Sequence, residues 1–224
     1  MALKTVLLAC ALATLAIDQA SASLITAATP EMNDVITFDE FDGTTTTHIT
    51  SQTLTSTLGE SVSFLSTPTS SIGPVVSAGS TNNYNFGANG LWDASKRFIA
   101  TDNAGSLQFT FSTAVQSFGA FFNYYVNPAQ TNNLRGFTIT ALDADGTVIE
   151  TDTVKFLTGG GVNDGRFFGI TSNSANIKTI SVTDGLVALD NLQFASAVPE
   201  PSTLGLMAAA LFAVGFVATR NRRQ

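Results

Sequence analysis

The strongest constraint on the fold of this chain is a two-residue alternation of apolar and polar side chains. Residues 107–112 read Leu-Gln-Phe-Thr-Phe-Ser, and residues 137–141 read Phe-Thr-Ile-Thr-Ala. This period places alternate side chains on opposite faces of a half-buried strand. Turn residues such as Asp143–Gly146 separate the runs, and no amphipathic helix interrupts them. The pattern predicts an all-β, jelly-roll-like sandwich of about nine or ten strands.

The expected β-sandwich domain spans residues 35–197 and follows a flexible leader at 23–34. A threonine-rich run at 44–57 reads as an edge strand or a long loop, and glycine, proline and serine predict a loop at 67–90. The expected strands lie at 35–41, 61–66, 107–112, 115–126, 137–141, 147–157, 166–171, 177–183 and 186–195.

The start of the chain has the pattern of an export signal. A single basic residue precedes an apolar run at 5–17, and the small residues Ala20 and Ala22 form a cleavage motif. We expect signal peptidase to cut before Ser23 and to remove residues 1–22.

Cys10 is the only cysteine of the chain and lies inside this signal. In the alternative interpretation, Leu7–Cys10 is a lipobox and Cys10 carries a lipid anchor. The apolar run before Cys10 is short for a lipoprotein, and it continues past the cysteine. Removal of the signal leaves no cysteine, which excludes disulfides, a thiolate nucleophile and cysteine-ligated metal sites.

The part of the chain between its two ends is strongly acidic. Without Lys4, Asp18, Glu200 and the three C-terminal arginines, the 17 acidic and 10 basic residues become fifteen and six. A net charge of about −9 repels nucleic acid and anionic lipid, so we expect neither as a ligand of the domain.

Residues 198–224 consist of three consecutive sequence blocks: a Pro-Glu-Pro motif, an uncharged stretch and a basic end. The uncharged stretch at 202–219 would extend about 27 Å as a helix, enough to cross the hydrocarbon core of a membrane. A proline suits the first turn of such a helix, and the basic end would stay on the cytoplasmic side. The motif residues on either side of the uncharged stretch are Val198, Pro199, Glu200, Pro201, Arg220, Arg222 and Arg223.

This tail resembles the PEP-CTERM protein-sorting signal of Gram-negative bacteria. The resemblance implies an inner-membrane precursor that faces the periplasm and is cut by an exosortase-type protease. It further implies release to the cell surface or extracellular space of a bacterium that makes biofilm or exopolysaccharide. The runs at 105–112 and 115–125 are also similar to the core of exported β-sandwich proteins with this tail. An ordinary C-terminal membrane anchor is the alternative.

Asp39, Glu40 and Asp190 are candidate ligands of a calcium ion. Counted by twos, Glu40 and Asp190 share a strand face with apolar residues unless a bulge intervenes, and a carboxylate that faces a core needs a cation. The sequence Leu-Asp-Asn-Leu-Gln-Phe around Asp190 resembles the closing strand of calcium-bearing carbohydrate-binding modules. Oxygen ligands favour calcium. The alternatives are a counter-charge from Arg97 or Arg166, or exposure to water.

Catalysis has little support in the sequence. His48 is the only histidine and stands in a threonine run with no acid placed to orient it. Acids are plentiful, but no pair of them marks a cleft of the kind that a glycosidase needs. We therefore expect no enzyme, and a secreted hydrolase is the least favoured of three hypotheses.

The other two hypotheses are a structural matrix protein and a carbohydrate-binding module. Tyr84 and Trp92 stand among asparagines and glycines, and their rings are candidates for stacking on a glycan. Trp92 suits a hydrophobic plug at one end of the sandwich even better.

Overall fold

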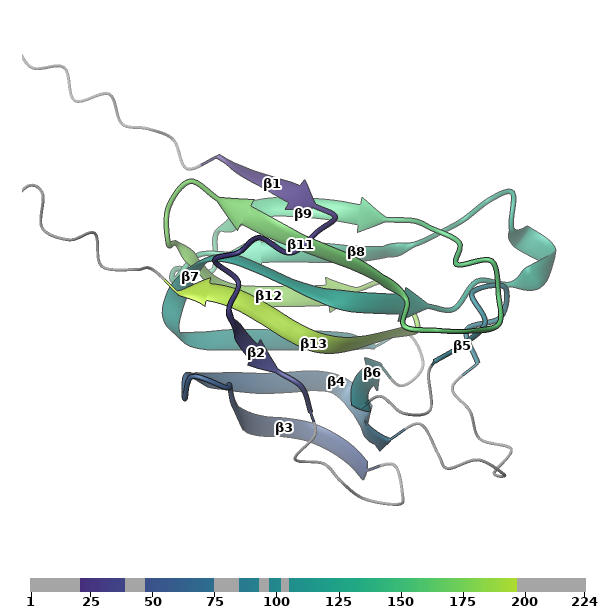
Figure 1. Cartoon of the computed structure of the whole chain (residues 1–224), viewed down its shortest axis with the longest axis horizontal. Helices are drawn as coiled ribbons and strands as arrows, with labels where there is room; N and C mark the ends of the chain where they lie inside the picture. The colour runs from purple at the N-terminus through teal and green to yellow at the C-terminus, as the bar shows by residue number, and fades with distance from the viewer. Residues whose placement is uncertain (1–20, 39–46, 75–84, 93–96, 102–104, 197–224) are drawn as a thin grey trace, which may run out of the picture.

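The computed structural model describes residues 21–38, 47–74, 85–92, 97–101 and 105–196 (Figure 1). These residues form strands and turns, with one short 3-10 helix, η1 (Pro128–Gln130). The all-β fold expected from the alternation is confirmed. Within the described ranges no helix is long and apolar enough to cross a membrane. The expected membrane helix at 202–219 lies outside them.

The main sheet has eleven strands, and β5 and β10 pair with each other in a separate two-stranded sheet. The strands are β1 (Ala22–Ile25), β2 (Asp34–Ile36), β3 (Thr47–Thr55), β4 (Ser61–Pro74), β5 (Leu91–Trp92), β6 (Arg97–Thr101), β7 (Ser106–Tyr124), β8 (Phe137–Leu142), β9 (Val148–Val154), β10 (Val162–Asn163), β11 (Arg166–Ser172), β12 (Ile177–Thr183) and β13 (Val187–Ser196).

The longest strand, β7, links two groups of strands. Its first half pairs with β4 and β12, and its second half pairs with β13 and β11. Glu60 supports the point where β7 changes its partner strands. Its Oε1 accepts hydrogen bonds there from the hydroxyl of Ser112 and from the amide of Thr113. The strand that carries most of the pairing therefore bends from one group into the other.

The two groups also meet on a second side. β4 pairs with β7 as far as Thr67 and with β6 from Ser70 onward, and β6 in turn pairs with β13. Pro68 stands between the two pairings of β4, a position that tolerates a residue without an amide hydrogen. The strands β7, β4, β6 and β13 thus form an almost closed circuit.

The first strand that the sequence predicts lies beside the last one. β2 runs antiparallel to β13, with Ile36 opposite Leu192 and Asp34 opposite Phe194. The strand expected at 35–41 is shorter, because Phe38 has a left-handed backbone conformation with φ 58°. Its side chain is nevertheless fully buried in the core.

Phenylalanine rings fill the space between the strand groups. Ring centroids lie 5.3 Å apart for Phe64 and Phe109, and 5.0 Å apart for Phe111 and Phe194. Strand β8 alternates buried and half-buried residues along its length, as the sequence pattern predicts. Burial of these large apolar surfaces supplies the main driving force for the fold.

Three expectations about individual segments are corrected. The expected leader at 23–34 contains part of β1, which pairs with β11. The expected loop at 67–90 begins as strand, since β4 continues to Pro74. The two strands expected at 107–112 and 115–126 are one bent strand. In the first two cases the residues themselves do not alternate in the way that predicts a strand. They form one because they hydrogen-bond to a strand that is distant in sequence, β11 for β1 and β6 for the end of β4.

Candidate functional site

Trp92 does not offer a surface for stacking on a glycan. Only 1% of its side chain is exposed, and its ring packs against Phe86 and Phe98, with centroids 6.3 and 5.8 Å away. The glycan-stacking role considered for Trp92 is therefore corrected in favour of the hydrophobic plug. Tyr84 lies outside the described residues.

Asp190 is buried in β13, and a bulge follows it. Its carboxylate accepts hydrogen bonds from the backbone amide of Asn191 at 2.6 Å and from the side-chain amide of the same residue at 3.1 Å. Asn191 has φ 51°, and the pairing with β7 shifts register there. Ala188 joins the small cluster around Trp92, whereas Leu192 and Phe194 join the main core. The bulge therefore separates Asp190 from the apolar face that the sequence assigned to it.

The calcium site stays a prediction. Asp39 and Glu40 lie outside the described residues, and only Asp190 of the three candidate ligands can be placed. In the described part of the chain, no group of three or more His, Cys, Asp or Glu side chains could hold a metal ion.

Two other residues singled out by the sequence occupy structural positions. Arg166 donates a hydrogen bond from Nη2 to the carbonyl oxygen of Leu157 at 2.7 Å, and its guanidinium lies 5.7 Å from the centroid of the Phe156 ring. His48 lies in the edge strand β3, opposite Ser71.

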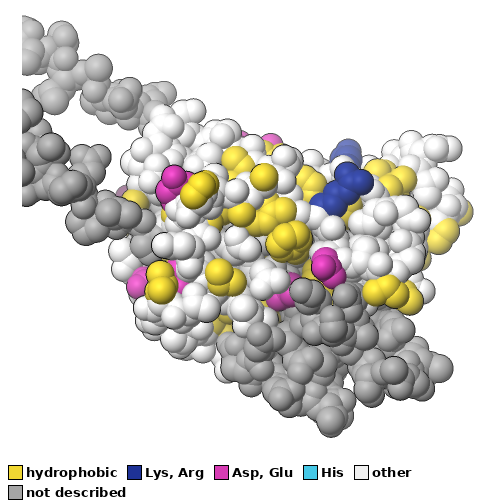
Figure 2. All heavy atoms as spheres, viewed as in Figure 1, with side chains coloured by type: hydrophobic (Ala, Val, Ile, Leu, Met, Phe, Trp, Pro, Cys, Tyr) yellow, Lys and Arg dark blue, Asp and Glu magenta, His cyan; other side chains and the backbone are white. Residues whose placement is uncertain are grey.

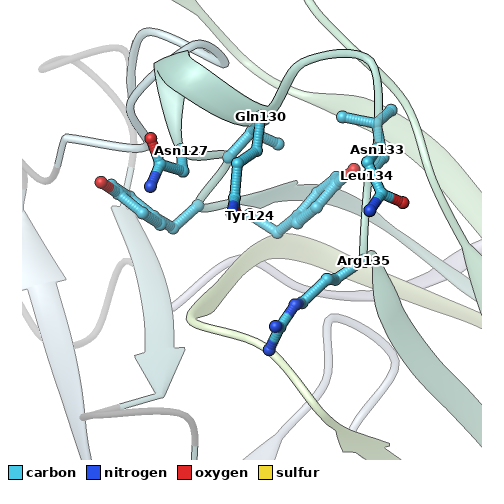
Figure 3. Close-up of a pocket in the computed structure, with 8 residues that line it drawn as sticks. Tyr124, Asn127, Gln130, Asn133, Leu134 and Arg135 are labelled. Carbon is cyan, nitrogen blue, oxygen red and sulfur yellow. The ribbon is translucent and has the colours of Figure 1, made fainter.

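A hollow that the sequence analysis missed lies where β7 ends. Its volume of about 350 Å³ falls within the range of small-molecule sites. Figure 3 shows Gln130 extending toward Tyr124 from the loop between β7 and β8, with Asn133 to one side and Arg135 below them. One short stretch of chain supplies the lining residues Tyr124, Tyr125, Val126, Asn127, Gln130, Asn133, Leu134 and Arg135.

Tyr124 is the fixed, buried part of this hollow. Its hydroxyl donates to the carbonyl oxygen of Phe156 at 3.1 Å and accepts from the amide of the same residue at 3.2 Å. Its ring packs against Phe137 and Phe156. Burial raises the pKa of the Tyr124 phenol, and its hydrogen bond to Phe156 opposes this only in part. The phenol is therefore protonated at any physiological pH.

Asn127 shapes the loop above Tyr124. Its Oδ1 accepts from the amide of Ala129 at 2.9 Å and caps η1, where Pro128 fills the first position. The amide of Gln130 donates to the carbonyl of Asn127, and that of Asn133 donates to the carbonyl of Gln130. These backbone bonds fix the loop without using the side-chain amides of Gln130 and Asn133.

Tyr125 forms the exposed wall of the hollow. Its side chain is 46% exposed, and its backbone amide donates to the carbonyl of Leu186 at 2.9 Å. Gly87 backs the ring, because a Cβ there would lie 3.1 Å from Cε2 of Tyr125 and 2.1 Å from the carbonyl oxygen of Val126. Glycine permits this close approach, and its φ of 64° suits glycine as well.

Three asparagines hold together the loops beneath the hollow. Nδ2 of Asn89 donates to the carbonyl of Tyr124 at 3.1 Å, and its Oδ1 accepts from the amide of Thr158 at 3.1 Å. The side-chain amides of Asn123 and Asn163 both donate to the backbone carbonyl of Asn89. Because this network is buried and connected, it orders the region before any ligand arrives.

Charge is unevenly distributed around the molecule. On the face seen in Figure 2, acidic side chains lie at several separate places, whereas the basic ones gather in one group. Arg135 is the only charged residue among the eight that line the hollow. The hollow is thus a locally basic site on a chain of net charge −7.

The tail can be assigned by comparison with known proteins. Residues 197–223 match the family model of the PEP-CTERM protein-sorting motif. The chain carries this sorting motif. It is therefore an exported protein that an exosortase processes during export. Neither the curated proteins nor the solved structures include a match to the chain.

Proposed function

We propose that the protein is a non-enzymatic β-sandwich that acts at the cell surface or in the extracellular matrix, associated with exopolysaccharide. The sorting motif at residues 197–223 is the observation that carries this proposal. A chain that is exported and then cut at its tail exposes its folded domain outside the inner membrane. The acidic composition of that domain keeps it soluble among secreted polymers.

A carbohydrate-binding function is the second candidate, and the hollow favours it. Glycan sites combine an aromatic surface with polar groups that fix hydroxyls, and Tyr125, Gln130 and Asn133 supply both. The eight lining residues include no carboxylate, whereas glycosidases use a pair of carboxyl groups. The composition of the hollow therefore favours binding of a glycan over its hydrolysis.

Fractionation of producing cells tests the first proposal. We expect the wild-type chain to lose its tail and to accumulate with extracellular polysaccharide, and enzymatic removal of that polysaccharide should release it. Glu200→Ala, or deletion of residues 220–224, should leave full-length chain in the inner membrane. Equal membrane retention of wild type and both variants would instead indicate a plain anchor. Processed protein that stays on cells stripped of polysaccharide would contradict the association.

A further inference from the structure

We propose that the hollow at the end of β7 binds an acidic sugar unit, such as a uronic acid residue of a polysaccharide. This inference rests on the carbohydrate association proposed above and adds its site and chemical class. It is carried by three features of the lining: an exposed aromatic ring, amide side chains that make no hydrogen bond to the described residues, and one cation without an ion pair among them.

Tyr125 supplies the stacking surface. Nearly half of its side chain is in solvent although its backbone is fixed at both ends. The amide of Tyr125 donates to Leu186, and the next amide, of Val126, donates to the carbonyl of Phe86 at 2.9 Å. The backbone that carries the ring is thus fixed while the ring is partly open to solvent, so a pyranose can cover it at little cost in backbone conformational entropy.

Gln130 and Asn133 supply hydrogen bonds for sugar hydroxyls. Neither side-chain amide makes a hydrogen bond with any residue that the structure describes. Both residues line the hollow and belong to a loop whose backbone is already fixed (Figure 3). Each amide offers two donor hydrogens and one acceptor oxygen, the combination that vicinal hydroxyls require.

Arg135 selects the acidic class. Its exposed guanidinium makes no ion pair and no hydrogen bond within the described part of the chain. A guanidinium presents paired N–H groups that match the two oxygens of a carboxylate, and such charge-assisted bonds are stronger than neutral ones. A uronic acid bears this carboxylate on a pyranose ring, so one ligand satisfies the ring, the amides and the cation together.

One carboxylate in the neighbourhood opposes this preference. The turn at Asp184 and Gly185 packs against Gly136 and Phe137, next to Arg135 in the chain. Oδ2 of Asp184 accepts from the hydroxyl of Thr183 at 3.0 Å, and the residue is exposed. The negative charge of Asp184 weakens the attraction of the hollow for an acidic ligand. Its removal is therefore a second, independent test of the selectivity.

Titration of the full chain, purified in detergent, with two matched probes tests the proposal. The probes are trigalacturonate and the neutral galactotriose, measured by isothermal calorimetry at low salt. We expect the acidic probe to bind about tenfold more tightly, the factor of one charge-assisted contact, and added salt to reduce this preference. Tyr125→Ala should abolish binding of both probes.

Charge variants then separate selectivity from binding. Arg135→Gln should remove the preference for the acidic probe, while Lys178→Gln, which removes a positive charge from β12 outside the lining of the hollow, should not. Asp184→Asn should tighten binding of the acidic probe alone, and asparagine tolerates the φ of 69° at that position.

Two results would overturn the inference. The first is that the wild type binds both probes with equal affinity and that Tyr125→Ala binds neither. This result would disprove the selectivity for acidic sugars but would still place carbohydrate binding at the hollow. Binding of neither probe, with the protein still retained by polysaccharide on cells, would disprove the site but not the proposed function.

Discussion

Asn89 is a single residue on which three segments of the chain depend. Its side chain is fully buried and serves the backbone of Tyr124 and of Thr158, while its own carbonyl accepts from Asn123 and Asn163. A buried polar group without its partner loses its interaction with water and gains nothing in return. The order of the hollow therefore depends on a residue that does not line it.

We predict that Asn89→Ala lowers the free energy of unfolding by about 2–3 kcal/mol, because it removes the partner of a buried carbonyl at Tyr124 and of a half-buried amide at Thr158. Thermal unfolding should show a fall in Tm of roughly 5–10 °C. The control is Asn133→Ala, which removes an exposed amide from the same region and should change Tm little. Similar Tm values for both variants would contradict the structural role of the network.

The pH dependence of stability should carry a contribution from Asp152. Burial raises the pKa of its carboxyl above the ordinary value of 3.8, and the charge of Glu150 adds to this. Its Oδ2 is buried and has no hydrogen-bond partner among the described residues. Because the folded state holds the proton more tightly, stability falls as pH rises from the unfolded pKa through the raised folded one.

Asp152→Asn should therefore remove the fall in stability that sets in as pH rises above the ordinary carboxyl pKa of 3.8, and it should raise Tm slightly near neutral pH. Asp145→Asn, in the exposed β8–β9 turn, is the control and should leave that part of the pH profile unchanged. Thermal unfolding across this pH range makes the comparison. A steeper fall of Tm with rising pH in Asp152→Asn than in wild type would contradict the predicted direction of the effect.

At the scale of elements, local patterns were predictable and distant pairings were not. The hairpin of β8 and β9 and the strand β12 follow from alternation and from the turn at Asp143, whose Oδ1 accepts from the amides of Asp145 and Thr147. β1 and β6 were missed because their hydrogen-bond partners, β11 and β4, lie far away in sequence. Period-two counting also failed at β13, where the bulge at Asn191 changes the face of every later residue.

The hollow could not be predicted from the sequence for a related reason. Residues 127–135 read as an ordinary polar turn between two strong strands, and nothing in them marks Gln130, Asn133 and Arg135 as free to bind. That freedom comes from the backbone bonds of η1 and from distant segments such as the loop at Gly87. The tail was recognisable in advance because its three blocks are contiguous.

The pairing of β7 with β11 depends on two glycines that face each other. Gly119 lies opposite Gly169, and a Cβ at Gly119 would lie 2.2 Å from Cζ of Phe167. We predict that Gly119→Ala costs about 1–3 kcal/mol through overpacking. In the Phe167→Leu background the same change should cost less, because the obstructing ring atom is gone. Additive effects in a double-mutant cycle measured by denaturant unfolding would contradict this contact.

At the scale of the whole molecule, an early strand and the last strand of the domain lie side by side. β2 pairs with β13, and Asp34 strengthens this junction by accepting from the hydroxyl of Ser56 at 2.7 Å and from the amide of Leu58 at 2.8 Å. The junction thus joins β2, the last strand β13 and the β3–β4 turn. Loosening it should free β2 from both of these partners, because β2 pairs with no other strand in the described part of the chain.

The last prediction concerns calcium at this junction. Asp190 is buried in β13 close to where β13 pairs with β2, and the chain that leaves β2 carries the other expected ligands, Asp39 and Glu40. A calcium ion held by these carboxylates would stabilise the native state by mass action. EDTA should then lower the Tm of the full chain by several degrees, and added calcium should restore it. Asp190→Asn should unfold at the same temperature with or without calcium. A wild-type melting curve indifferent to EDTA and calcium would rule out the site, and one restored equally by magnesium would rule out selectivity for calcium.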